Sequence, residues 1–127
     1  MKPFEKKQLL DKVLKRLSGK TVLVEGKRDA QAITALCEDA VVVLALGKAD
    51  VVLKKIPGKN AVLLFDFDKE GLRKKSFFKV FLEENGFRVD TVTALRLRSA
   101  LGFLFVEDAF RKYEELLEEL NEVDRNG

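Results

Sequence analysis

The sequence predicts an α/β fold in which a single parallel sheet of about four strands, in the order 2-1-3-4, carries helices on both faces. Two observations predict it. Short apolar segments of strand type alternate with longer segments whose apolar residues recur at helical spacing. Two of the strand segments are continuously apolar, which is typical of parallel strands buried on both faces. At 127 residues, the chain is expected to form one domain spanning residues 1–127.

The first half of the chain contains two helical segments and two strand segments. Apolar residues at helical spacing predict a helix over 3–17, which Ser18-Gly19 ends. A strand is expected over 20–25 and a helix over 28–37. Residues 40–46 form a continuous apolar run, which predicts a second strand buried on both faces.

The next part repeats this alternation. It predicts a short helix over 50–56, a third strand over 60–65, a helix over 69–84 and a fourth strand over 87–92. The helix over 69–84 is expected to place four apolar side chains on one face, namely Phe77, Phe78, Phe81 and Leu82.

In the last part of the chain, the pattern is ambiguous over 94–104 and helical over 106–120. Residues 94–104 fit a strand, a helix or a mixture of the two, and the pattern leaves these alternatives open. A final helix is expected over 106–120, with one apolar stripe formed by Val106, Phe110, Tyr113, Leu117 and Leu120.

The composition excludes several kinds of chemistry. The chain has no histidine, which removes Ser-His and Cys-His nucleophilic pairs and nearly all zinc sites. Its one cysteine, Cys37, cannot form an internal disulfide and is expected to be a small core residue. Acid–base chemistry must therefore come from Glu, Asp, Lys or the single tyrosine, Tyr113, whose place on an apolar stripe favours packing over catalysis.

Charge is unevenly distributed along the chain. Residues 1–20 carry seven Lys and Arg against two acids, whereas residues 107–127 carry three against eight. The basic start fits either a nucleic-acid contact or, more commonly, the solvated face of a helix. No apolar run approaches the roughly 20 residues that span a bilayer. No membrane association is expected, and the protein is expected to be cytoplasmic.

Acidic residues follow two of the predicted strands at the point where each ends. Asp66 and Asp68 come after the third strand, and Glu25 follows the first. In the order 2-1-3-4 these strands are neighbours about 4.8 Å apart, so Glu25 is expected to face Asp66 and Asp68. Carboxylates are the ligands that Mg²⁺ prefers, which predicts a Mg²⁺ site at this edge of the sheet, with Mn²⁺ as an alternative ion. Capping of the next helix would explain Asp68 but not Asp66 or Glu25.

Three segments together resemble the Toprim domain, a Rossmann-like domain shared by topoisomerases, bacterial-type primases, OLD-family nucleases and small ribosomal RNA maturation nucleases. The resemblance covers roughly residues 20–92. Topoisomerases and primases need further domains that this chain does not contain, so the small stand-alone members are the more similar ones. The segments are Val24-Glu25-Gly26-Lys27-Arg28-Asp29, then Gly47, then Asp66-Phe67-Asp68-Lys69-Glu70-Gly71.

The resemblance implies roles for these residues. Glu25 would be the general acid or base and a metal contact, while Asp66 and Asp68 would hold Mg²⁺. Glu70 matches the third acid of the topoisomerase motif, whose final glutamate is replaced here by Leu72. The loop glycines would be Gly26, Gly47 and Gly71.

Two sets of residues complete the expected site. Asp29 matches a commonly acidic family position, or it caps the following helix, and both alternatives stay open. Six cations lie in or near the same loops and would face a phosphate backbone, namely Lys27, Arg28, Lys48, Lys69, Arg96 and Arg98.

Together these features predict a Mg²⁺-dependent nuclease, with RNA slightly favoured over DNA as the substrate. The alternative is a non-catalytic Toprim module that binds nucleic acid or a protein partner. Small-molecule phosphotransfer is a third class, which would need a nucleotide-sized pocket above Asp66. The acidic last helix is expected to pack on this domain or on a second copy, which would form a homodimer.

Overall fold

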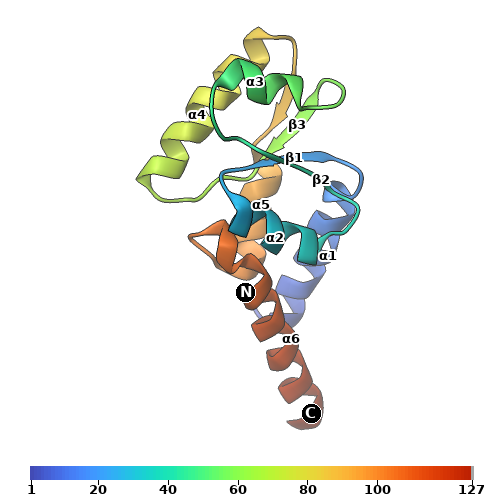
Figure 1. Ribbon diagram of the computed structural model, residues 1–127. Coiled ribbons are helices and arrows are strands. Elements are labelled where there is room, and N and C mark those ends of the chain that lie inside the picture. Colours follow the sequence, from blue (N-terminus) through green and yellow to red (C-terminus); the bar gives the residue numbers. More distant parts are fainter. Residues whose placement is uncertain (127) are drawn as a thin grey trace.

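Helices and strands alternate along the chain, which is described by a computed structural model over residues 1–126, with side chains described over residues 1–122 (Figure 1). The helices are α1 (Pro3–Leu17), α2 (Lys27–Leu36), α3 (Ala49–Lys54), α4 (Lys69–Glu84), α5 (Val92–Leu101), the 3-10 turn η1 (Val106–Asp108) and α6 (Ala109–Asn126). The strands are β1 (Thr21–Val24), β2 (Val41–Leu44), β3 (Asn60–Leu63) and β4 (Arg88–Asp90).

The four strands form one parallel sheet in the order β2-β1-β3-β4, which confirms the predicted fold class and strand order. In this order β1 lies in the interior of the sheet, with Val22 opposite Val42 on one side and opposite Val62 on the other. β2 lies on one side of β1, and the chain then crosses over to form β3 on the other side of β1. The strand order therefore reverses between β1 and β3. The ends of β1 and β3 are therefore the place where a ligand is expected in such a sheet.

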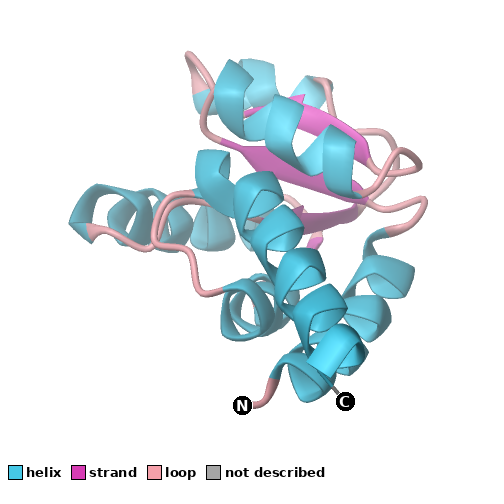
Figure 2. Cartoon of the chain, turned by 90° about the horizontal axis from the view of Figure 1, so that it is seen from below, coloured by secondary structure: helices cyan, strands magenta, loops and turns pink. Residues whose placement is uncertain are grey.

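Helices cover both faces of the sheet (Figure 2). In Figure 1, α3 and α4 lie above the strands, and α1, α2, α5 and α6 lie below them. Successive strand side chains point to opposite faces, so Leu63 packs in the α3–α4 layer with Phe78, whereas Val62 packs in the other layer with Leu97. Cys37 is buried in this second layer, as predicted.

Strand β2 differs from the prediction. The apolar run over 40–46 was expected to be buried on both faces, but Val41 is exposed and Val42 and Leu44 are only partly buried. The reason is topological: β2 is an edge strand with one neighbour, so the helices do not close over it as they close over β1.

The structure also shows what residues 94–104 form and where the last helix begins. Most of the segment over 94–104 is helical, because it lies within α5, whose Ala94, Leu97 and Leu101 are buried. The expected helix over 106–120 begins instead with the 3-10 turn η1, and α6 starts at Ala109. The predicted apolar stripe of this helix included Leu117, but the leucine buried on the inner face of α6 is Leu116.

Two further side-chain placements refine the predicted faces. Tyr113 packs against the core, in agreement with a structural role. On α4, Phe78 and Leu82 are buried, but Phe77 is 53% exposed, so the four apolar residues do not share one buried face. Over the described residues, no helix is both long enough and apolar enough to cross a membrane.

Candidate metal centre

Glu25 and Asp66 meet at the carboxyl edge of the sheet. β1 and β3 are hydrogen-bonded neighbours, and the pairing continues one step past β3, where Leu64 N donates to Leu23 O at 2.9 Å. The chain then brings Asp66 N to within 3.3 Å of Glu25 Oε2, to which it donates a hydrogen bond. The adjacency that strand order implies for these two acids is therefore present in the structure.

A third carboxylate joins them. Glu25, Asp29 and Asp66 each offer an oxygen, and the three oxygens lie within 4.8 Å of one another. Asp29 lies in the first turn of α2 and is only 8% exposed. Its Oδ2 also accepts a hydrogen bond of 3.1 Å from Gly26 N, so Asp29 both caps α2 and belongs to this group. We call these three residues the acid cluster, and it could hold a metal ion.

Each carboxylate of the acid cluster is held by a backbone N–H. Asp66 N bonds Glu25, Gly26 N bonds Asp29, and Val106 N donates to Asp66 Oδ1 at 2.8 Å. A backbone donor fixes one oxygen of each carboxylate and leaves the other oxygen able to turn toward a shared ligand. The cluster is therefore oriented before any cation arrives.

Asp68 lies outside the acid cluster, at the N-cap of α4. Its Oδ1 accepts a hydrogen bond of 2.8 Å from Gly71 N, and its backbone is extended as an N-cap requires. A shared direction for Asp66 and Asp68 would need an extended chain through both residues. The chain instead bends at Phe67 and Asp68 to enter α4, and Asp68 is not among the carboxylates that gather with Asp66.

Glu70 is also outside the acid cluster. It is exposed on the first turn of α4 and forms an ion pair with Arg73 at 3.0 Å. Exposed pairs of this kind contribute little to stability. Of the acids that the Toprim motif suggests, the structure thus brings together Glu25, Asp66 and Asp29, and it does not bring Asp68 or Glu70 into the same group.

Gly71 allows α4 to begin directly against Asp66. A Cβ at this position would lie 2.0 Å from Asp66 O, so any side chain would displace the backbone that carries the acid. Gly47 has a φ of +83°, which favours glycine in the turn after β2. Gly26 has an extended backbone that other residues adopt, and the atom nearest its Cβ position is Asp29 Oδ2 at 4.0 Å, an ordinary contact distance.

The loop after α5 covers the segment between β3 and α4. Phe67 N donates to Leu104 O at 2.9 Å, one residue after Asp66 receives its bond from Val106. Arg98 supports the same loop, because its Nε donates to Phe103 O at 3.2 Å and its guanidinium lies 4.7 Å from the centre of the Phe67 ring. Arg98 is thus committed to holding the loop.

The other predicted cations are exposed. Lys27 and Lys69 are the first residues of α2 and α4, and Lys48 is the N-cap of α3, so all three lie where strand-to-helix loops end. Arg96 is exposed on α5. Arg28 lines a hollow beside α6 together with acidic side chains, among them Glu107 and Glu114.

Lys74 is a contact that sequence reasoning missed. Its Nζ lies 3.6 Å from Glu25 Oε1, whose side chain is only 13% exposed. The signal was present, because Lys74 follows Gly71 by three residues on α4 and therefore faces the same side. The Val106 N–H had no such signal, since every residue except proline carries one.

Two of the three carboxyls, Glu25 and Asp29, bind protons more tightly than isolated carboxyls do. Burial raises the pKa of the Glu25 carboxyl above its usual range, and its contact with Asp66 adds to the rise. Burial likewise raises the pKa of Asp29 to about 6, and the negative charge of Asp66 acts in the same direction. A cation among the three would offset both effects, because it favours the charged form of each carboxyl.

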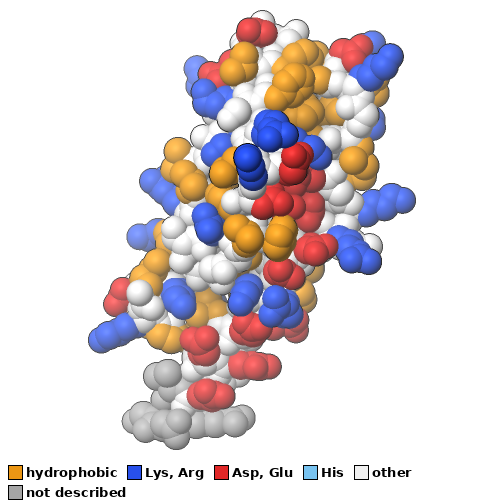
Figure 3. Space-filling model, turned by 90° about the vertical axis from the view of Figure 1, so that its left-hand side faces the viewer, with side chains coloured by type: hydrophobic (Ala, Val, Ile, Leu, Met, Phe, Trp, Pro, Cys, Tyr) orange, Lys and Arg blue, Asp and Glu red, His pale blue; other side chains and the backbone are white. Residues whose placement is uncertain are grey.

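The surface around the acid cluster combines acidic, basic and apolar side chains. Figure 3 shows one face of the molecule on which acidic side chains gather near the middle, with Lys and Arg side chains and apolar side chains beside them. Exposed apolar residues follow strands or loops at this edge, including Leu46, Leu104 and Phe105. The edge thus combines carboxylates with cationic and apolar contacts.

No family model matches this sequence, and no curated protein matches it. A solved structure of a protein from Aquifex aeolicus is similar to it, with 28% sequence identity and a TM-score of 0.65. The match covers 80% of this chain and 95% of that chain. The description of that protein names no activity, so the similarity supports the fold and leaves the function to the chemistry of the site.

Proposed function

We propose that this protein is a metal-dependent nuclease that cleaves phosphodiester bonds in nucleic acid, with RNA slightly favoured over DNA. The observation that carries the proposal is the meeting of Glu25 and Asp66, 3.3 Å apart from backbone N to carboxylate, with Asp29 beside them. The meeting occurs between β1 and β3, where the strand order reverses and where α/β sheets bind their ligands.

The resemblance to the Toprim domain supports the same function. Its two short motifs are Glu25-Gly26 and Asp66-x-Asp68-x-x-Gly71, whose first acids are 41 residues apart in the sequence. Packing alone does not explain why two such acidic strand ends lie side by side. The close approach of Gly71 to Asp66 gives the motif glycine a physical reason, since a side chain there would displace the acid.

The acid cluster fits a hard divalent cation. Its three ligands are carboxylate oxygens, and the described residues around it include no sulfur or imidazole donor. Glu25, Asp29 and Asp66 would hold Mg²⁺, or Mn²⁺ in its place. The ion would neutralise charge on the phosphoryl oxygens and help to orient the attacking group.

Residues of the chain would transfer the proton and bind the phosphate groups. In a site without histidine a carboxyl is the natural proton carrier, and Glu25 matches the Toprim residue that would act as general acid or base. Lys74, 3.6 Å from Glu25, would contact a phosphate that approaches the cluster. Lys27, Lys48 and Lys69 stand at the ends of the neighbouring loops and would attract the backbone of a nucleic acid.

The test is cleavage of structured RNA and of DNA with Mg²⁺ present and with EDTA added. We expect Mg²⁺-dependent cleavage that falls by about a hundredfold or more in Asp66→Asn and Glu25→Gln. Glu70→Gln is the matched control, since Glu70 is exposed and, among the described side chains, its ion pair is with Arg73. Absence of cleavage of either nucleic acid by the wild-type protein would rule out the nuclease.

One observation favours a second candidate, a non-catalytic module that binds nucleic acid or a protein partner. Asp68 is occupied as the α4 cap and Glu70 is turned to Arg73, so two acids of the motif are not part of the acid cluster. A binding module predicts retention of labelled RNA or DNA in a gel-shift experiment with no product after long incubation. The nuclease predicts product under the same conditions.

A further inference from the structure

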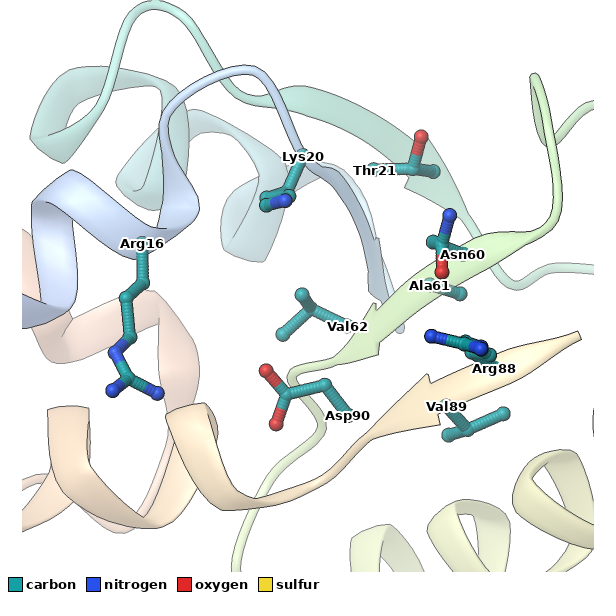
Figure 4. Close-up of a pocket in the computed structure, with 9 residues that line it drawn as sticks. All are labelled: Arg16, Lys20, Thr21, Asn60, Ala61, Val62, Arg88, Val89 and Asp90. Carbon is teal, nitrogen blue, oxygen red and sulfur yellow. The ribbon is translucent and has the colours of Figure 1, made fainter.

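A separate cleft of about 370 Å³ lies at the other edge of the sheet from the acid cluster (Figure 4). Thr21, Asn60 and Arg88 line it, and each is the first residue of its strand. The acid cluster follows the last residues of β1 and β3. A strand of four residues spans about 13 Å, so the cleft and the cluster are distinct sites.

The rim of the cleft is cationic. Arg16 comes from the last turn of α1, Lys20 precedes β1 and Arg88 begins β4. In the view of Figure 4, Arg16 and Lys20 lie on one side of Val62 and Arg88 lies on the other. All three cations are exposed, and within the described side chains none forms an ion pair.

The one carboxylate in the lining is already engaged. Asp90 Oδ1 accepts hydrogen bonds from Val92 N at 2.9 Å and Thr93 N at 3.0 Å, and Asp90 Oδ2 accepts one from the Thr93 hydroxyl. These bonds fix the start of α5. The three cations therefore outnumber a single carboxylate that the protein itself uses, and the cleft favours an anionic ligand.

The floor of the cleft is apolar. Val62 is a buried residue of β3 that faces this side of the sheet, whereas the side chains of Ala61 and Val89 pack in the α3–α4 layer on the other side. An inorganic anion would leave this floor uncovered, whereas a ligand with a flat ring would cover it. Asn60 adds an amide, which can both donate and accept hydrogen bonds to a polar ring edge. The volume is in the range of small-molecule sites.

We propose that this cleft binds a nucleoside monophosphate unit, with its phosphate on Arg16 and Lys20 and its base over Val62 toward Arg88. The unit is either a free nucleotide or the phosphorylated end of a nucleic-acid strand. Arginine suits this role, because its planar guanidinium binds phosphate through two parallel hydrogen bonds and also stacks on flat rings. The proposal concerns a site apart from the acid cluster and needs no metal ion.

Calorimetric titration with adenosine 5′-monophosphate, in EDTA, tests the proposal. We expect saturable binding with a dissociation constant below about 1 mM. Arg16→Gln and Arg88→Gln should each weaken it roughly tenfold, because the first removes a charge-assisted contact to the phosphate and the second removes a guanidinium that stacks on the base. Lys12→Gln is the matched control on α1, since Lys12 is exposed and does not line the cleft, and Glu25→Gln should leave binding unchanged.

Further ligands identify the part of the nucleotide that is bound. Adenosine and inorganic phosphate should each bind more weakly than the nucleotide; equal binding of either would overturn the proposal. Competition by a 5′-phosphorylated oligonucleotide, and not by its 5′-hydroxyl form, would assign the site to a strand end. Lack of competition by both, with the nucleotide still bound, would assign it to the free nucleotide.

A measurement on the wild-type protein keeps the test independent of how the variants fold. Amide chemical shifts should change on nucleotide addition at the first residues of β1, β3 and β4, around Thr21, Asn60 and Arg88. Shifts confined to Glu25 and Asp66, or no saturable change up to about 10 mM nucleotide, would overturn the proposal.

Discussion

Val106 orients Asp66 from 40 residues further along the chain, by donating a backbone hydrogen bond of 2.8 Å to Asp66 Oδ1. Val106 is the first residue of η1 and is fully buried. The loop that precedes it is held in turn by the bond from Phe67 N to Leu104 O. The orientation of a strand-end acid therefore depends on a segment outside the region of 20–92 that resembles the Toprim domain.

Removing that N–H should weaken ion binding. Proline fits at Val106, because the first position of a helical turn tolerates it and Phe105 before it is already extended, at φ −105° and ψ 129°. We expect Val106→Pro to weaken Mn²⁺ binding about five- to tenfold, the equivalent of one lost hydrogen bond. Titration followed by the Mn²⁺ paramagnetic resonance signal measures it. Val106→Ala shortens the same side chain but keeps the donor, so its affinity should stay within about twofold of wild type.

Gly71 should be intolerant of any side chain. A Cβ there would lie 2.0 Å from Asp66 O, so Gly71→Ala must push α4 away from the end of β3. We expect a loss of about 3 kcal/mol in the free energy of unfolding, measured by urea denaturation. Gly26→Ala is the matched control, with 4.0 Å to the nearest atom and an extended backbone, and should cost less than about 1 kcal/mol. Equal losses in the two variants would contradict the close approach.

Asp29 should make the ion-free protein less stable as the pH rises. Its folded pKa of about 6 lies above the ordinary value of 3.8, so the folded state holds this proton more tightly than the unfolded state. The resulting stabilisation is complete below the unfolded pKa and is lost as the pH rises through about 6. In EDTA, Asp29→Asn should therefore flatten the fall in unfolding free energy between these two pKa values and be the more stable protein at neutral pH. Saturating Mg²⁺ should stabilise the wild type and not this variant at neutral pH, and a steeper fall in the variant would contradict the placement of Asp29.

Asp68 should act as a helix cap in a way that another capping residue can replace. Its Oδ1 accepts from Gly71 N at 2.8 Å, and a serine hydroxyl can accept the same bond. We expect Asp68→Ala to lose about 1 kcal/mol of unfolding free energy and Asp68→Ser to lose only a few tenths. Thermal unfolding in EDTA measures both. Equal destabilisation would contradict the cap, and a loss of ion affinity in both variants would add Asp68 to the ligands of the metal.

The strand order of the sheet and the meeting of Glu25 with Asp66 could be predicted, because both follow from topology. Alternating strands and helices imply a parallel sheet, and the order 2-1-3-4 places Glu25 beside Asp66. The same order makes β2 an edge strand, so the exposure of Val41 was implied by the topology, although the apolar run suggested burial. For α5, the helical spacing of Ala94, Leu97 and Leu101 was masked by apolar neighbours.

The rest of the site depends on local backbone geometry that residue types do not encode. Whether Asp68 faces Asp66 depends on where the chain stops being extended, and the bend at Phe67 decides this. Asp29 fits a cap and a ligand equally well in sequence, and only the structure shows that it both caps α2 and lies beside Glu25 and Asp66. The donor at Val106 is a main-chain group, so no pattern of side chains could point to it.

The acid cluster is assembled from pieces that no short peptide contains. Glu25 and Asp29 lie on one segment, Asp66 on a second, and the N–H that orients Asp66 belongs to a third. An unfolded chain would hold these carboxylates far apart, so a divalent ion should bind the folded state alone and raise the melting temperature with its concentration. If the cluster binds an ion as proposed, that binding would report how much of the protein is folded, and a fragment lacking the last 25 or so residues should lose that response along with the fold.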